Sequence, residues 1–180
     1  MRQIASDLGT AHRQWGWYLA LGILMILVGI YAIYAEGLAT LTAVIALGFV
    51  VLIAGVGQII AAFMARGAGH VILLLLVGFL DIIVGIALLQ HPALGALFIT
   101  LLLAALFLFG GIFRIVSALW LQFPNYGWVA GSGVISVILG ILLWAQWPVS
   151  AFWFIGFAVG LNFIFAGIAW SSLGLKLKTL

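Results

Sequence analysis

One acidic and one basic side chain stand out within the long apolar stretches of this sequence. Asp81 lies in the stretch of residues 71–90, and Arg114 lies in the next one, residues 93–119. A charged side chain is costly inside a membrane, so it usually faces other helices and marks a functional position. An acid and a base on neighbouring helices could form an ion pair, or could bind a proton or a small solute.

Asp81 and Arg114 are predicted to differ in depth by about six residues, or ~9 Å at the rise of an α-helix. Side chains lean toward the N-terminus of their own helix, so on antiparallel helices these two lean toward each other. A direct or water-bridged pair is therefore feasible. Three interpretations stay open. The pair could be structural, the two could act separately with Arg114 reaching the interface and a protonated Asp81 bonding a neighbouring helix, or both could serve proton or solute movement.

Two further polar residues are candidates for a role. Asn162 lies in the middle of the last apolar stretch, and we expect its amide to form a hydrogen bond between helices, worth about 1 kcal/mol. His91 precedes Pro92 at a turn. Its imidazole is either a simply solvated turn side chain or a sensor of external pH through protonation.

No catalytic arrangement is recognisable. The glycine-rich places lie inside apolar stretches and not between a strand and a helix, so they are not phosphate-binding loops. The chain has no cysteine, which removes thiolate chemistry and cysteine-ligated metals. Serines occur without a histidine and an acid arranged as a triad: Ser132, Ser136, Ser150, Ser171 and Ser172. We therefore expect no enzymatic activity, no catalytic, cofactor-binding or metal-binding residues, and no nucleic-acid partner.

The composition identifies the bilayer as the solvent of this chain. Of 180 residues, 68% are hydrophobic and 5% are charged, whereas soluble domains carry about 25% charged residues. Each apolar stretch has about 20 or more residues, enough to cross a hydrocarbon core of ~30 Å. The stretches do not alternate as barrel strands do, and helices satisfy their own backbone in lipid. The sequence predicts an all-α polytopic membrane protein, a single domain of residues 1–180, with six spans near residues 15–34, 39–64, 71–90, 93–119, 128–145 and 149–171.

The distribution of basic residues predicts the orientation. With six spans, both termini lie on one side, and the loops on the opposite side contain no lysine or arginine. The positive-inside rule then places both termini in the cytoplasm. The basic residues on or near the cytoplasmic side are Arg2, Arg13, Arg66, Arg114, Lys176 and Lys178.

Glycines recur at matching spacings and divide the chain into three tandem helical hairpins, about residues 15–66, 70–122 and 127–173. Gly22 is followed by a glycine after seven residues and by another 26 residues later, and the same spacing starts at Gly78. The third copy, from Gly133, differs by one inserted residue. Asp81 corresponds to Met25 and Ser136 in the other copies. Arg114 corresponds to Gln58 and Trp170, which makes Gln58 another polar candidate.

Small residues let helices approach closely in lipid, where no hydrophobic effect drives them together. A seven-residue spacing returns to nearly the same helix face, so we expect these glycines to line the packing faces of the spans; the alternative is that they are gating hinges. The repeats have parallel topology, which makes an alternating-access transporter less favoured without excluding it. The predicted packing residues are Gly22, Gly29, Gly55, Gly78, Gly85, Gly111, Gly133, Gly140, Gly156, Gly160 and Gly167.

The second and third repeats carry a resemblance to a known family. Gly78 and Gly85 lead to His91-Pro92 and then to Phe109-Gly110-Gly111-Ile112-Phe113-Arg114. Gly133 and Gly140 lead to Trp147-Pro148 and then to Phe165-Ala166-Gly167-Ile168. Over about residues 17–173 the chain resembles the HdeD family of bacterial inner-membrane proteins, also called the DUF308 repeat family. The first repeat departs from the pattern, with Ala35-Glu36 where the family often has a proline.

The resemblance implies a six-span inner-membrane protein associated with acid resistance and envelope stress. It implies no established catalytic residues, and none are carried over. Two functions are compatible with these residues. The first is a non-enzymatic stress protein in the lipid bilayer that acts through assembly, as a homo-oligomer or with a membrane-protein partner. The second is a proton-linked transporter or channel for a small solute that uses Asp81 and Arg114.

Overall fold

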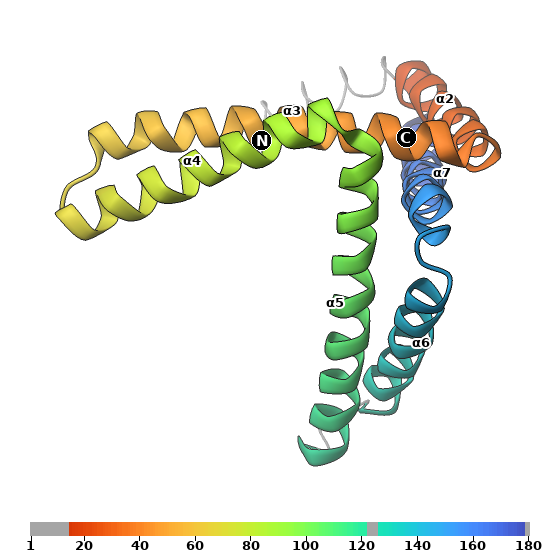
Figure 1. Cartoon of the computed structure of the whole chain (residues 1–180). Coiled ribbons are helices and arrows are strands. Elements are labelled where there is room, and N and C mark those ends of the chain that lie inside the picture. The colour runs from red at the N-terminus through yellow and green to blue at the C-terminus, as the bar shows by residue number, and fades with distance from the viewer. Residues whose placement is uncertain (1–14, 122–125, 179–180) are drawn as a thin grey trace, which may run out of the picture. The chain divides into compact units, whose positions relative to one another are not determined.

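The computed structural model describes residues 15–121 and 126–178. Within these residues the chain forms α-helices and no strand (Figure 1), which confirms the predicted all-α class. The six helices described are α2 (Trp15–Tyr34), α3 (Glu36–Met64), α4 (Ala68–Gln90), α5 (Pro92–Leu121), α6 (Tyr126–Ala145) and α7 (Ser150–Lys178).

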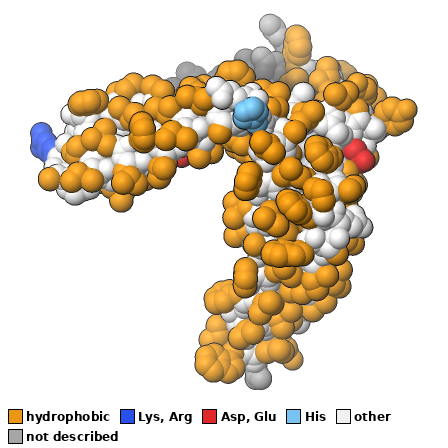
Figure 2. Space-filling model, in the orientation of Figure 1, with side chains coloured by type: hydrophobic (Ala, Val, Ile, Leu, Met, Phe, Trp, Pro, Cys, Tyr) orange, Lys and Arg blue, Asp and Glu red, His pale blue; other side chains and the backbone are white. Residues whose placement is uncertain are grey.

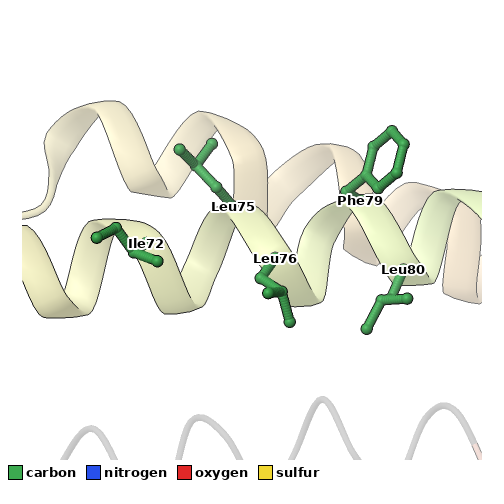
Figure 3. Close-up of a pocket in the computed structure, with 5 residues that line it drawn as sticks. All are labelled: Ile72, Leu75, Leu76, Phe79 and Leu80. Atoms are coloured by element: carbon green, nitrogen blue, oxygen red, sulfur yellow. The ribbon is translucent and has the colours of Figure 1, made fainter.

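All six helices are long and apolar enough to cross a membrane, with 20 to 30 residues each. Large hydrophobic side chains are exposed along every helix, and Figure 2 shows them over most of the visible face. Figure 3 shows one such area, a shallow depression lined along α4 by Ile72, Leu75, Leu76, Phe79 and Leu80. Such a surface is stable only in contact with lipid. The chain is a multi-pass membrane protein.

Short connections join several helices. Ala35 alone separates α2 from α3, and His91 alone separates α4 from α5. Pro92 begins α5, a position where its missing N–H is no loss because the first helical N–H groups have no partner in the helix. Gly67 precedes α4 with a φ of 101°, a left-handed conformation that side chains other than glycine rarely adopt.

The chain divides into two compact units. The first comprises residues 1–39 and 156–180, and therefore α2 and most of α7. The second comprises residues 40–155, and therefore most of α3, all of α4, α5 and α6, and the start of α7. The single domain of residues 1–180 stays a prediction.

In the second unit, α3 and α4 pack through glycines. A methyl group built on Gly55 would lie 2.7 Å from the carbonyl oxygen of Gly78, and one on Gly78 would lie 2.9 Å from the carbonyl oxygen of Gly55. At the other end of the contact, a methyl group on Gly85 would lie 2.8 Å from the backbone nitrogen of Leu52 and 3.0 Å from the carbonyl oxygen of Gly48. The two backbones therefore touch where no side chain separates them.

Helices α5 and α6 repeat this contact. A methyl group on Gly111 would lie 2.8 Å from the carbonyl oxygen of Gly133, and one on Gly133 would lie 2.9 Å from that of Gly111. A methyl group on Gly140 would lie 2.8 Å from the backbone nitrogen of Leu108 and 3.0 Å from the carbonyl oxygen of Ala104. Figure 1 shows both pairs, α3 with α4 and α5 with α6, lying side by side.

In the first unit, α2 and α7 form the third copy of the contact. A methyl group on Gly22 would lie 2.7 Å from the carbonyl oxygen of Gly167. One on Gly29 would lie 2.6 Å from the carbonyl oxygen of Gly160. Gly156 also meets backbone atoms, those of Glu36 at the start of α3. All eleven glycines predicted to line packing faces are buried.

The glycine contacts join successive repeats. The second helix of one predicted hairpin packs on the first helix of the next, as α3 does on α4 and α5 does on α6. The last helix, α7, packs on the first, α2. We call these three contacts the repeat junctions. They bring the corresponding polar positions of different repeats next to each other.

Candidate functional site

The α3–α4 junction holds Asp81. Its carboxylate oxygen Oδ2 accepts a hydrogen bond of 2.8 Å from Nε2 of Gln58. Each residue stands three positions after a contacting glycine, and the Cβ atoms of Asp81 and Gln58 lie 3.0 Å and 3.2 Å from methyl groups built on Gly55 and Gly78. The close approach of the backbones therefore fixes this pair. Both side chains are half-buried.

The amide of Gln58 leaves one atom unused. Its Oε1 is buried and accepts no hydrogen bond from any described residue. An amide rotated by about 180° around its last bond would present oxygen to Asp81 and would accept a hydrogen bond from a protonated carboxyl at the same position. The pair can therefore satisfy Asp81 in either protonation state.

The α5–α6 junction holds Arg114. Its Nη1 donates a hydrogen bond of 3.3 Å to the hydroxyl oxygen of Ser136. Ser136 in turn donates to the carbonyl oxygen of Ser132 at 2.9 Å. Ser136 is 7% exposed, whereas Arg114 is exposed. This hydrogen bond is long, and a neutral hydroxyl is a weaker acceptor for a guanidinium than a carboxylate or a phosphate would be.

The α2–α7 junction is aromatic at the corresponding level. Trp170, which matches Gln58 and Arg114 in the repeat, stacks on Tyr18 with ring centroids 5.7 Å apart. Nearby, the hydroxyl of Ser171 is buried and has no hydrogen-bond partner among the described residues. The three junctions therefore share a backbone contact and differ in the chemistry beside it.

Asp81 and Arg114 do not pair directly. Each bonds another residue, and no ion pair joins the two within the described part of the chain. The reason is the junction packing, because α4 meets α3 while α5 meets α6. The sequence placed the two residues on one hairpin, but it did not show which helices would be in contact.

Asn162 corrects a further expectation. Its side chain is exposed and forms no hydrogen bond with any described residue, so the predicted interhelical bond is not present. The face of α7 that meets α2 is occupied by Gly160, Ile164 and Gly167. Asn162 is two residues from both Gly160 and Ile164, about 200° around the helix from each, and therefore lies on another face.

His91 is exposed at the connection between α4 and α5. Its backbone N–H donates to the carbonyl oxygen of Ala87 and closes α4. The residue borders an apolar hollow of 460 Å³ between α3, α4 and α5, lined mainly by aliphatic side chains and Phe98. This exposed position is compatible with both interpretations of His91, a solvated turn side chain and a sensor of external pH. Within the described residues, no three histidine, aspartate or glutamate side chains are grouped to hold a metal ion.

The sequence interpretation missed several contributors. The carbonyl oxygen of Gly48 contacts Gly85 at the α3–α4 junction, and that of Ala104 contacts Gly140 at the α5–α6 junction. Gly160 occupies the equivalent position at the α2–α7 junction. The signal was available, since each lies seven residues before a predicted packing glycine. The sequence identifies Ser136 as the counterpart of Asp81 and as a serine outside any triad, but not as a partner of Arg114. The buried hydroxyls of Thr40 and Ser150, which donate to carbonyl oxygens, gave no signal in sequence.

The helices and their junctions define a multi-pass α-helical membrane protein built from tandem repeats. A family model described as a short repeat of unknown function (DUF308) matches residues 20–89 and again residues 76–145. The chain belongs to this family. The two matches are offset by 56 residues, as Gly78 is from Gly22. No curated protein and no solved structure matches the chain significantly.

Proposed function

We propose that this chain is a bacterial inner-membrane protein of the HdeD type, which contributes to resistance against acid and envelope stress without enzymatic activity. It acts through assembly, as a homo-oligomer or with another membrane protein. Membership of the DUF308 family and the six spans support this proposal. The observation that carries it is that the glycine contact, which recurs at all three repeat junctions, serves helix packing.

The polar residues of the spans fit a structural role. Asp81 and Arg114 each bond a side chain on the neighbouring helix of their own junction. Polar side chains in lipid commonly join helices in this way. Under this proposal they fix the register of each helix pair, and the exposed Asn162 is available to a partner helix.

A proton-linked transporter or channel is the second candidate. The observation that favours it is the Gln58–Asp81 pair, because the amide can satisfy the carboxyl with or without a proton. Acids in the middle of membrane helices often belong to proton pathways. Arg114 would then serve the same solute at another junction.

Asp81→Asn separates the two functions, because asparagine keeps the acceptor for Gln58 and cannot exchange a proton. Each protein is expressed in a bacterial host whose own gene for this protein is deleted. If the protein acts through assembly, the host survives acid challenge equally well when it expresses the variant and when it expresses the wild type. Liposomes containing either protein then show no pH-driven flux. The opposite outcome is that the wild type shows a proton flux and that Asp81→Asn, at equal protein levels, abolishes both this flux and survival. That outcome would contradict the assembly proposal and support a proton-linked transporter or channel.

We also propose that both termini lie in the cytoplasm, and the absence of native cysteine makes this testable. Gly69 has open space around it and lies near Arg66, on the predicted inner side. His91 is exposed on the predicted outer side. We expect a membrane-impermeant maleimide to label His91→Cys in intact spheroplasts, and Gly69→Cys only after the membrane is disrupted. The reverse pattern would invert the orientation.

A further inference from the structure

Within the described part of the chain, Arg114 is a cation without an anionic partner. Its one hydrogen bond within the described residues goes to the neutral hydroxyl of Ser136, at 3.3 Å. The acid in the same unit, Asp81, is bonded to Gln58. The side chain is exposed, and its neighbours Phe113 and Val116 are exposed hydrophobic residues. A guanidinium in such apolar surroundings needs an anion, which a membrane supplies as lipid phosphate.

The register of the junction places Arg114 near the membrane interface. A methyl group built on Gly133 of the antiparallel helix α6 would lie 3.2 Å from Cβ of Arg114, and the guanidinium bonds Ser136, so this side chain lies at the level of residues 133–136. Trp128 is five residues farther out than Gly133, or about 7.5 Å at the helical rise. Its indole is 85% exposed, and that of Trp120, beyond Arg114 on α5, is 89% exposed. Exposed tryptophans at helix ends mark the level of lipid headgroups.

The exposed Ser132 extends the polar surface beside Arg114, whereas Ser136 is buried. Ser132 and Ser136 lie one turn apart on α6, and Ser136 already accepts a hydrogen bond from the guanidinium. Ser132 is exposed. A guanidinium offers five donors in a planar fork that suits phosphate oxygens. The α5–α6 junction therefore presents an exposed cation and the exposed Ser132 on the inner side of two tryptophans.

We propose that this junction binds the phosphate of an anionic phospholipid, with Arg114 as the ion-pairing residue. Basic positions between membrane helices near the cytoplasmic surface are suited to such headgroups. An anionic lipid is favoured over a zwitterionic one because its phosphate is not balanced by a charge in its own headgroup. The acyl chains lie against the exposed apolar faces beside Arg114. The other two junctions have Gln58 bonded to Asp81 and Trp170 stacked on Tyr18, so one such site is expected per chain.

Native mass spectrometry of the full-length protein in a neutral detergent tests this site. Phosphatidylglycerol and phosphatidylcholine with the same acyl chains are titrated separately. We expect the wild type to retain one phosphatidylglycerol per chain about fivefold or more tightly than phosphatidylcholine. Arg114→Gln, which can still bond Ser136, should lose this preference, and Arg114→Lys should keep most of it. Arg66→Gln removes an exposed charge elsewhere in the same unit and should change nothing.

Three results would overturn the proposal. One is an unchanged preference for phosphatidylglycerol in Arg114→Gln. Another is an equal loss in Arg66→Gln, which would mean diffuse attraction to net charge. The third is displacement of the bound lipid by millimolar inorganic phosphate, which would assign the site to a soluble anion. Thermal unfolding of each variant in the same detergent verifies that the folded protein is compared.

Discussion

Replacing Gly111 with alanine is expected to destabilise the protein by about 1–3 kcal/mol, the usual cost of overpacking a tight contact. The added methyl group would lie 2.8 Å from the carbonyl oxygen of Gly133 and 2.9 Å from the backbone nitrogen of Val137. Both atoms belong to the backbone of α6, so relief requires the helices to separate. Separation sacrifices the van der Waals contact that holds helices together in lipid. The measurement is unfolding in mixed micelles by titration with a denaturing detergent.

The neighbouring glycine provides a matched control. Gly110 has no atom within 4 Å of an added methyl group, apart from those of its own local backbone. Gly110→Ala changes the same helix by the same group, and any gain in helix propensity applies at both positions. We expect this variant to be as stable as the wild type or slightly more stable. Equal destabilisation by the two substitutions would show that α5 does not meet α6 through Gly111.

Replacing Gln58 with leucine is the second change with a large expected effect. It leaves the carboxyl of Asp81 without its 2.8 Å hydrogen bond in an apolar span, and an unsatisfied buried polar group costs about 1–3 kcal/mol. Asp81→Met should cost a similar amount, because it leaves the amide of Gln58 unpaired. The corresponding residues of the α2–α7 junction are Met25 and Trp170, so an apolar pair is compatible with this contact.

The double variant Gln58→Leu/Asp81→Met should therefore recover much of the loss. Residues in direct contact are non-additive, with coupling free energies of roughly 0.5–3 kcal/mol. Unfolding of the four proteins of this cycle, in the same micelles, measures that coupling. Additive losses would mean that the hydrogen bond between α3 and α4 contributes nothing to stability.

The helices themselves were largely predictable from sequence. The first span, residues 15–34, coincides with α2, and the others were placed within a few residues at most ends. Hydropathy marks the part of a helix that lies in hydrocarbon, so it cannot detect where a helix continues into the headgroup region. This explains why α7 extends to Lys178 and α3 begins at Glu36, beyond the apolar stretches.

The partner of each helix was not predictable in the same way. A line of glycines shows which face of a helix will be in contact, but any other small-residue face is complementary to it. Asp81 was therefore expected beside a glycine contact, whereas the hydrogen-bond partners of Asp81 and Arg114, Gln58 and Ser136, followed only from the structure. Asn162 shows the opposite error. The cost of a polar group in lipid suggested an inward position, yet the small residues of α7 had already determined its inward face.

The junctions also have a consequence for how such a chain could arise. The glycines of the three repeat junctions each contact a helix from another copy. A free-standing two-helix ancestor would have carried two different packing faces, one on each helix. It could have buried both only by head-to-tail self-association with other copies. Lys178 stands over the ring of Trp15 at 5.0 Å, where the last copy meets the first. Gene triplication would then have fused three separate subunits into one polypeptide while keeping the interfaces that already joined them.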